Sequence, residues 1–158
     1  MPAAMHEFYL RNMYQHNRLA EPGGISLKGI PIDLRLIGTP TFLLSTKEDH
    51  IAPWRSTYAA TQIYGGPITF VLSASGHIAG VISPPGSKYG HLRNSELPKN
   101  PEEWLGKATA HSGSWWPFWD DWVMQFADGM TTARNPGGGG LQPLEDAPGA
   151  YVRVRAVS

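Results

Sequence analysis

The sequence predicts an α/β fold in which two parallel strands are joined by a crossover helix and followed by a helical C-terminal segment. Two short runs, 41–45 and 68–72, are apolar throughout, which is typical of parallel strands covered on both faces. Between them, Pro53 suits the first turn of a helix, and Gly65 and Gly66 would end that helix. Strand, helix and strand within about 30 residues indicate a βαβ unit with a right-handed crossover.

A first helix is predicted ahead of this unit. Across residues 5–19, apolar side chains recur at helical spacing, namely Met5, Phe8, Tyr9 and Met13. The string Pro22-Gly23-Gly24 would end the helix. The N-terminus lacks the charged and apolar regions of a secretory signal peptide, so none is expected.

Two more helices are predicted after the second strand. Residues 100–103, Asn-Pro-Glu-Glu, combine an N-cap residue, a proline in the first turn and acidic side chains near the positive end of the helix dipole. Residues 114–127 predict the second helix, which Gly129 would end, with an apolar stripe of Phe118, Trp119, Trp122, Val123 and Phe126.

The remaining segments are expected to be loops. Residues 85–100 lack a clear pattern, and residues 135–149 are rich in proline and glycine, as in a flexible linker or surface loop. Two strands do not make a stable sheet alone. No further strand is nevertheless expected before the run 151–155, so the partners of the two apolar strands should lie elsewhere.

Composition excludes several classes of function. The 158 residues carry 13 basic and 13 acidic side chains, a balance that points neither to nucleic acid nor to an anionic membrane surface as a partner. No apolar stretch is long enough to cross a membrane. Cysteine is absent, which excludes disulfides, zinc–thiolate sites and a cysteine nucleophile within this chain.

Two loops at strand ends carry the candidate chemistry. Asp49 follows the first predicted strand and His77 follows the second. In a parallel sheet, neighbouring strands lie about 5 Å apart and present ligands at their carboxyl ends. The pair can therefore form the acid–base half of a nucleophile–His–acid triad, in the chain order of α/β-hydrolases. The alternative is that Asp49 caps the following helix and His77 is an ordinary loop histidine.

Other side chains give weaker signals. His50 competes with His77 as the base, but neighbours in sequence rarely point together, so His50 is expected to be structural or a substrate contact at the mouth of the site. The other four histidines lack metal-ligand spacing and are read as surface or packing residues: His6, His16, His91 and His111. No metal site is expected. The cluster 115–122 holds four of the six tryptophans and is read as core, with a polymer groove as the functional alternative.

The nucleophile of the triad is missing from the chain. No G-x-S-x-G or G-x-C-x-G string occurs, and Ser73 and Ser75 lie too close to His77 to form a separate nucleophile elbow. In the hydrolase order the nucleophile precedes the acid, so the chain is expected to begin after it.

Several motifs together resemble one family. The strings FYLRNMYQHNRL with IDLRLIGTP, STKEDHIAPW, SGHIAGVISPP, GSWWPFWDDW and APGAYVRVR are similar, in this order, to the C-terminal part of class I poly(3-hydroxyalkanoate) synthases. The resemblance implies an α/β-hydrolase-like acyltransferase that polymerises 3-hydroxyacyl-CoA into polyester and releases CoA. It implies a Cys–His–Asp triad whose acid is Asp49 and whose base is His77. CoA enters as substrate, and no cofactor is implied.

The resemblance also implies organisation and surroundings. The intact enzyme is expected to be a cytoplasmic, granule-associated homodimer that binds 3-hydroxyacyl-CoA, the growing polyester and the granule surface. Without its cysteine, this chain alone is expected to be inactive. Residues 1–134 would be the C-terminal portion of the catalytic domain, and residues 135–158 would be a loop and tail. Within the first part, residues 1–24 would be the end of a cap region, 38–85 the Asp/His unit and 100–129 the tryptophan-rich helices.

Two alternatives stay open from the sequence. The first is a fragment of a serine α/β-hydrolase, such as an esterase or polyester depolymerase, which an upstream G-x-S-x-G would reveal. The second is a non-catalytic module whose tryptophan-rich helix binds a granule surface.

Overall fold

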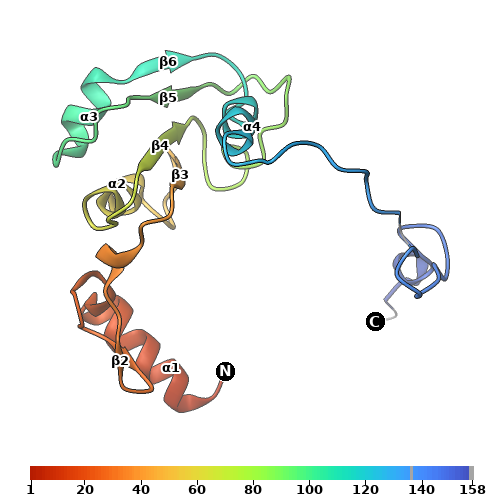
Figure 1. The fold of residues 1–158 in the computed structure, drawn as a ribbon, viewed down its shortest axis with the longest axis horizontal. Helices are drawn as coiled ribbons and strands as arrows, with labels where there is room; N and C mark the ends of the chain where they lie inside the picture. The colour runs from red at the N-terminus through yellow and green to blue at the C-terminus, as the bar shows by residue number, and fades with distance from the viewer. Residues whose placement is uncertain (136, 157–158) are drawn as a thin grey trace. The chain divides into compact units, whose positions relative to one another are not determined.

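The computed structural model describes residues 1–135 and 137–156, which divide into two compact units, Met1–Met124 and Gln125–Ser158 (Figure 1). The first unit contains a mixed sheet and helices, so the predicted α/β class is confirmed. No helix in the described part of the chain has the length and apolar character needed to cross a membrane.

The predicted strand–helix–strand unit forms the centre of the first unit. Strand β3 (Thr41–Thr46) pairs in parallel with β4 (Ile68–Ser73), in a register that places Thr46 opposite Ser73. Between them lie helix α2 (Trp54–Tyr58) and the 3₁₀ helix η4 (Ala59–Gln62). The last four residues of β4 are buried, which explains the apolar run from Phe70 to Leu72 and leaves Ser73 as a buried polar residue at its end.

The sheet is larger than the sequence analysis expected. Strands β5 (His91–Arg93) and β6 (Thr109–His111) add antiparallel neighbours, giving the order β3-β4-β5-β6. The expectation of no further strand before residues 151–155 is therefore wrong, and Tyr151–Arg153 forms the 3₁₀ helix η5 instead of a strand. Strands of three residues are too short to show an alternating pattern, and β5 consists of His, Leu and Arg.

The N-terminal region also departs from the prediction of one helix across residues 5–19. Helix α1 (Ala3–Tyr9) continues as the π-helix η1 (Leu10–Gln15), and the short 3₁₀ helix η2 (Arg18–Ala20) follows. The side-chain amide of Asn12 donates to the Phe8 carbonyl at 2.8 Å, where it competes with the backbone pattern of an α-helix. Asn17, with a φ of 47°, ends the helical run.

A turn-rich connection leads from this helical region to the sheet. A small antiparallel pair, β1 (Ser26–Leu27) and β2 (Ile30–Pro31), precedes the 3₁₀ helix η3 (Leu34–Leu36). The Asp33 carboxylate caps η3 by accepting from the Arg35 N–H at 3.0 Å.

Both helices predicted beyond the second strand are present. Helix α3 (Pro101–Lys107) begins as expected, because the Asn100 side chain accepts from the Glu102 N–H at 2.9 Å. Helix α4 (Trp116–Met124) is shorter than the predicted 114–127.

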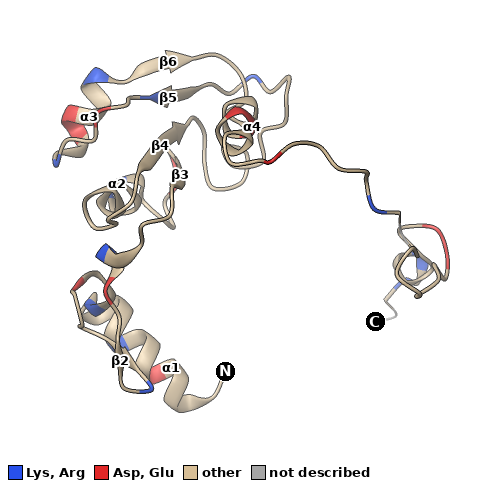
Figure 2. Cartoon of the chain, viewed as in Figure 1, with Lys and Arg blue, Asp and Glu red and all other residues tan. Residues whose placement is uncertain are grey.

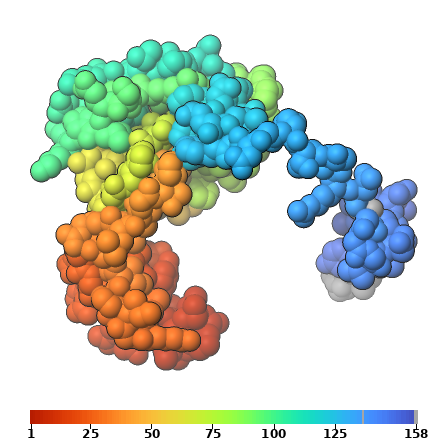
Figure 3. Space-filling view, in the orientation of Figure 1, coloured from red at the N-terminus to blue at the C-terminus, as the bar shows by residue number. Residues whose placement is uncertain are grey.

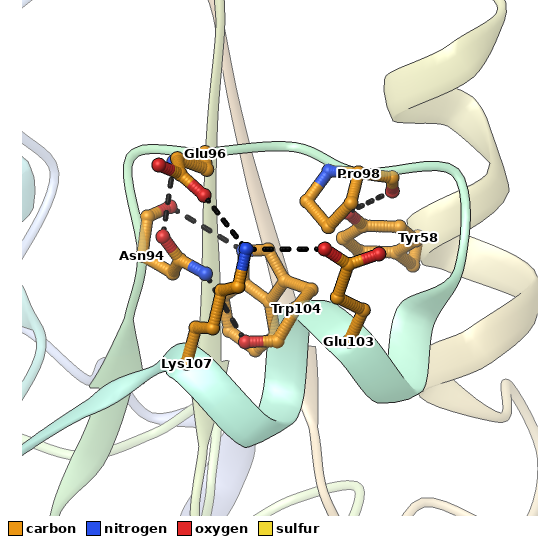
Figure 4. A network of polar contacts seen from close by, with 7 residues as sticks. All are labelled: Tyr58, Asn94, Glu96, Pro98, Glu103, Trp104 and Lys107. Carbon is orange, nitrogen blue, oxygen red and sulfur yellow. Dashed lines mark hydrogen bonds and ion pairs between the residues drawn. The ribbon is translucent and has the colours of Figure 1, made fainter.

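The core of the first unit is aromatic. Trp104 is fully buried, and its ring centroid lies 4.9 Å from Phe70, 5.9 Å from Tyr58 and 6.3 Å from Trp54. A network of polar contacts surrounds it (Figure 4): the indole N–H donates to the Asn94 carbonyl at 3.3 Å, and the Asn94 amide returns a bond to the Trp104 carbonyl at 3.2 Å. These contacts fix α3 and the segment after β5 against β4.

Candidate active site

The two loops predicted to carry chemistry meet at the carboxyl ends of β3 and β4. Nδ1 of His77 lies 2.8 Å from Oδ2 of Asp49. The backbone explains the approach, because the parallel pairing continues past the strands. The Lys47 N–H donates to the Ser73 carbonyl at 2.9 Å, and the Glu48 N–H donates to the Ser75 carbonyl at 3.0 Å. The acid and the imidazole are thus brought together by main-chain contacts.

Gly80 keeps the loop that carries His77 close to β3. A Cβ atom on residue 80 would lie 2.5 Å from Cγ2 of Thr46 and 2.6 Å from the Ala74 carbonyl oxygen. Both distances are far below van der Waals contact, so no larger residue fits without displacing the loop. The close approach therefore depends on glycine at this position.

The Asp49 carboxylate is held by more than the histidine. Its Oδ1 accepts from the backbone N–H groups of Ile51 and Ala52, each at 2.9 Å. These bonds, with the Ala52 N–H first and the His77 contact next, lower the pKa of Asp49 to about 2. Asp49 is therefore ionised at neutral pH. The alternative that Asp49 caps the following helix is wrong, because the N-cap of α2 is Pro53 and no side chain bonds to it. One oxygen of Asp49 instead accepts from the loop ahead of α2, and the other faces His77.

The imidazole of His77 is oriented and accessible. A carboxylate only accepts hydrogen bonds, so Nδ1 carries the proton in the neutral ring and donates it to Asp49. Nε2 then carries the lone pair, and it has no hydrogen-bond partner among the described residues. The His77 side chain is 51% exposed, whereas that of Asp49 is 8% exposed. This arrangement suits a general base that is anchored on one side and open on the other.

No hydrogen bond joins the other histidines to this pair in the described part of the chain. His50 is exposed beside Asp49, and no hydrogen bond of its side chain is recorded within the described residues. His91 is buried in β5 and stacks on His111 of β6, with ring centroids 5.4 Å apart. No group of three His, Cys, Asp or Glu side chains suited to a metal ion occurs in the described part of the chain.

Sequence reasoning missed the two backbone donors to Asp49. Ile51 and Ala52 have apolar side chains, and only their N–H groups take part. A signal was nevertheless present in the string Asp49-His50-Ile51-Ala52-Pro53, because an aspartate shortly before a proline and a helix favours a side-chain-to-backbone turn. Only the structure shows that the Ile51 and Ala52 N–H groups help to lower the pKa of Asp49.

Comparisons with known proteins identify relatives that match nearly the whole chain. The poly(3-hydroxyalkanoate) polymerase of Methylorubrum extorquens is 46% identical over 158 residues, which cover 99% of this chain and 26% of the relative. The poly(3-hydroxyalkanoate) polymerase subunit PhaC of Rhizobium meliloti is 48% identical over 157 residues, covering 99% and 25%. The subunit PhaC of Cupriavidus necator is 42% identical over 158 residues, covering 99% and 27%. No protein-family model matches the chain.

These findings confirm the resemblance that the motifs indicated. The chain is homologous, over nearly its full length, to poly(3-hydroxyalkanoate) polymerases. It spans about a quarter of the length of these curated relatives.

Proposed function

We propose that this chain supplies the acid and the base of a polyester-forming acyltransferase. The chain corresponds to about a quarter of the length of each related poly(3-hydroxyalkanoate) polymerase. The observation that carries the proposal is the 2.8 Å contact between Asp49 and His77 at the carboxyl ends of two parallel strands. The substrate would be a 3-hydroxyacyl-CoA, and the products would be CoA and a polyester lengthened by one unit.

In this reaction His77 acts as the base at Nε2. It first takes the proton from a cysteine thiol, which this chain lacks, so that the thiolate attacks the acyl thioester. The C–S bond to CoA then breaks, and the imidazolium returns the proton to the departing CoA thiolate. The imidazole then takes the proton from the hydroxyl group at the end of the polyester as that oxygen attacks the enzyme-bound thioester, and it passes this proton to the cysteine sulfur released when the C–S bond breaks. Ionised Asp49 holds the tautomer with the lone pair on Nε2 and stabilises the imidazolium formed in each step.

The same proposal extends to the fold and to the rest of the site. Parallel strands that end in an acid and then a histidine support the C-terminal part of an α/β-hydrolase fold, in which the nucleophile precedes both. His50, exposed beside Asp49, would contact the substrate at the mouth of the site. Residues 1–134 would belong to the catalytic domain and residues 135–158 would form a tail, in a homodimeric enzyme on cytoplasmic polyester granules.

A chimera tests the proposal directly. The segment of the Rhizobium meliloti polymerase subunit that aligns with this chain is replaced by the chain itself, and CoA release from 3-hydroxybutyryl-CoA is measured. Asp49→Asn should lower the rate by about 10⁴-fold through loss of tautomer control, and His77→Gln should lower it by about 10⁶-fold because the base itself is lost.

The matched control is Glu48→Gln, which neutralises an exposed neighbouring carboxylate and should leave the rate unchanged. An active chimera in which Asp49→Asn and His77→Gln release CoA at nearly the normal rate would contradict the assignment.

A further inference from the structure

An apolar groove lies between the loop that follows His77 and the start of helix α4. It has a volume of about 580 Å³. Val81, Ile82 and Pro85 line it from the loop, and Trp115, Trp116 and Trp119 line it from the helix side. Figure 3 shows α4 in blue beside the green segment that contains this loop. Trp119 is 43% exposed, so its indole offers accessible apolar surface beside the loop.

The walls of the groove are preformed. The indole N–H of Trp115 donates to the Gly80 carbonyl, and that of Trp116 donates to the Val81 carbonyl, each at 3.1 Å. The Ser114 hydroxyl adds a bond to the Ser83 carbonyl. These contacts hold the loop and the helix together, and they occupy the polar edges of both indoles. A ligand therefore meets rigid apolar surface, which lowers the entropy cost of binding.

The groove lies on the same loop as the candidate base. Between His77 and Ile82 the chain makes a helical turn, in which the Gly80 N–H donates to the Gly76 carbonyl at 3.0 Å and the Ile82 N–H donates to the Ile78 carbonyl at 2.8 Å. The Val81 N–H donates to the Ile78 carbonyl at 3.1 Å, which folds the segment after His77 back on itself. Val81 is four residues after His77, so the groove begins one turn from the imidazole.

The charge of the groove indicates what it accepts. Its lining contains no lysine or arginine, and its one charged residue is Asp120. Figure 2 shows acidic and no basic residues on α4, as its sequence WPFWDDWVM requires. The phosphates of CoA would be repelled here. A neutral chain with alkyl branches and no hydrogen-bond donor fits the apolar walls without leaving a polar group unpaired.

We propose that this groove binds the neutral polyester next to its growing end, while the CoA portion of the substrate approaches His77 from another side. The inference rests on the proposed function, because the relatives' chemistry identifies the neutral chain as a polyester. It assigns a binding role to Trp116 and Trp119 of the tryptophan cluster, whereas Trp115 and Trp122 also pack against Phe42.

Calorimetric titration of the 158-residue chain tests the proposal, with the linear tetramer of (R)-3-hydroxybutyrate methyl ester as the probe. The tetramer should bind saturably, and CoA should not bind. Trp119→Ala should weaken tetramer binding at least tenfold. The matched control is Met124→Ala, because both side chains lie on α4 and are 43% and 47% exposed, yet only Trp119 lines the groove.

Ile82→Asp provides a second variant that is independent of the helix. Ile82 is 62% exposed, so the substitution leaves the core intact while placing a charge in the groove, and it should weaken the tetramer as Trp119→Ala does. Equal tetramer affinity in wild type, Trp119→Ala and Ile82→Asp would overturn the proposal. A dimer of the chain that both variants abolish would also overturn it, because the groove would then be covered by a second copy of the chain.

The chimera described above separates this proposal from the proposed function. An active chimera together with a chain that binds no tetramer overturns the groove assignment alone. An inactive chimera together with groove-dependent tetramer binding supports the groove as a site for ester chains and counts against the polymerase assignment alone.

Discussion

Replacing Gly80 by alanine should destabilise the chain by about 1–3 kcal/mol, the usual cost of overpacking a well-packed site. The new methyl group would lie 2.5 Å from Cγ2 of Thr46 and 2.6 Å from the Ala74 carbonyl oxygen. A side-chain methyl on a buried strand and a backbone oxygen cannot both move away, so the loop that bears His77 must shift. Urea unfolding followed by far-UV circular dichroism measures the loss, with an unchanged m-value showing that only stability has altered.

Gly38→Ala is the matched control for this substitution. A Cβ atom at residue 38 would meet nothing within 4 Å, so the change should be neutral or should stabilise the chain by about 0.4–1 kcal/mol through the unfolded state. Thr46→Ser removes the atom at 2.5 Å but leaves the Ala74 carbonyl in place. The double variant should therefore recover part of the loss, with a coupling of about 0.5 kcal/mol or more.

The same substitution should separate His77 from Asp49. A displacement of about 1 Å between catalytic groups can lower a rate by about 10²-fold, so the Gly80→Ala chimera should release CoA about 10²-fold more slowly than the wild-type chimera. If Gly80→Ala unfolds at the same urea concentration as Gly38→Ala, the packing argument is wrong. The Gly80 site would then tolerate a side chain by relaxation that the structure does not show.

Three further outcomes are expected. Trp104→Ala should lower the free energy of unfolding by about 3–5 kcal/mol in the urea assay, because a fully buried indole is lost. Trp119→Ala should lower it by about 0.5 kcal/mol or less. Equal losses in the two variants would contradict the assignment of Trp104 to the core. Burial, chiefly, and the nearby charges of Arg93 and His111 hold the pKa of His91 below its usual 6.5 in the folded chain. As the pH falls below about 6.5, the unfolded state therefore binds the proton first, and the free energy of unfolding should decline toward the folded pKa. His91→Gln should make this decline less steep. An unchanged slope in the variant would contradict the assignment of the decline to His91. A ¹³C NMR titration should give Asp49 a pKa of about 2 in the wild type. In His77→Gln the pKa of Asp49 should rise but stay below about 3.9, because the Ile51 and Ala52 N–H groups remain. A pKa of Asp49 near 3.9 in the wild type would refute the hydrogen-bonding pattern.

The central unit and its Asp–His contact could be anticipated from local sequence. Residues 41–45 and 68–72 are mostly apolar runs of five residues, each followed by turn-forming residues, so their pattern does not depend on distant contacts. The carboxyl ends of parallel strands then bring Asp49 and His77 into reach of each other. The catalytic roles of both residues remain predictions.

Strands β5 and β6 could not be anticipated, for a physical reason. Each has three residues, and its conformation is set by pairing with a neighbour that is distant in sequence, as where His91 lies opposite both Ser73 and His111. The run 151–155 shows the converse. Its alternating Tyr-Val-Arg-Val-Arg pattern fits a strand, but residues Tyr151–Arg153 form a 3₁₀ helix, since no ladder partner is recorded for them in the described residues.

The continuation of the parallel ladder into the two loops has a consequence for how this region can change over time. The bonds from the Lys47 and Glu48 N–H groups to the Ser73 and Ser75 carbonyls involve only main-chain atoms, and the side chains of Lys47 and Glu48 are exposed. Mutations at positions 47 and 48 can therefore accumulate without altering the spacing of Asp49 and His77. The loops are free to diversify in charge and shape while the acid–base pair stays in register.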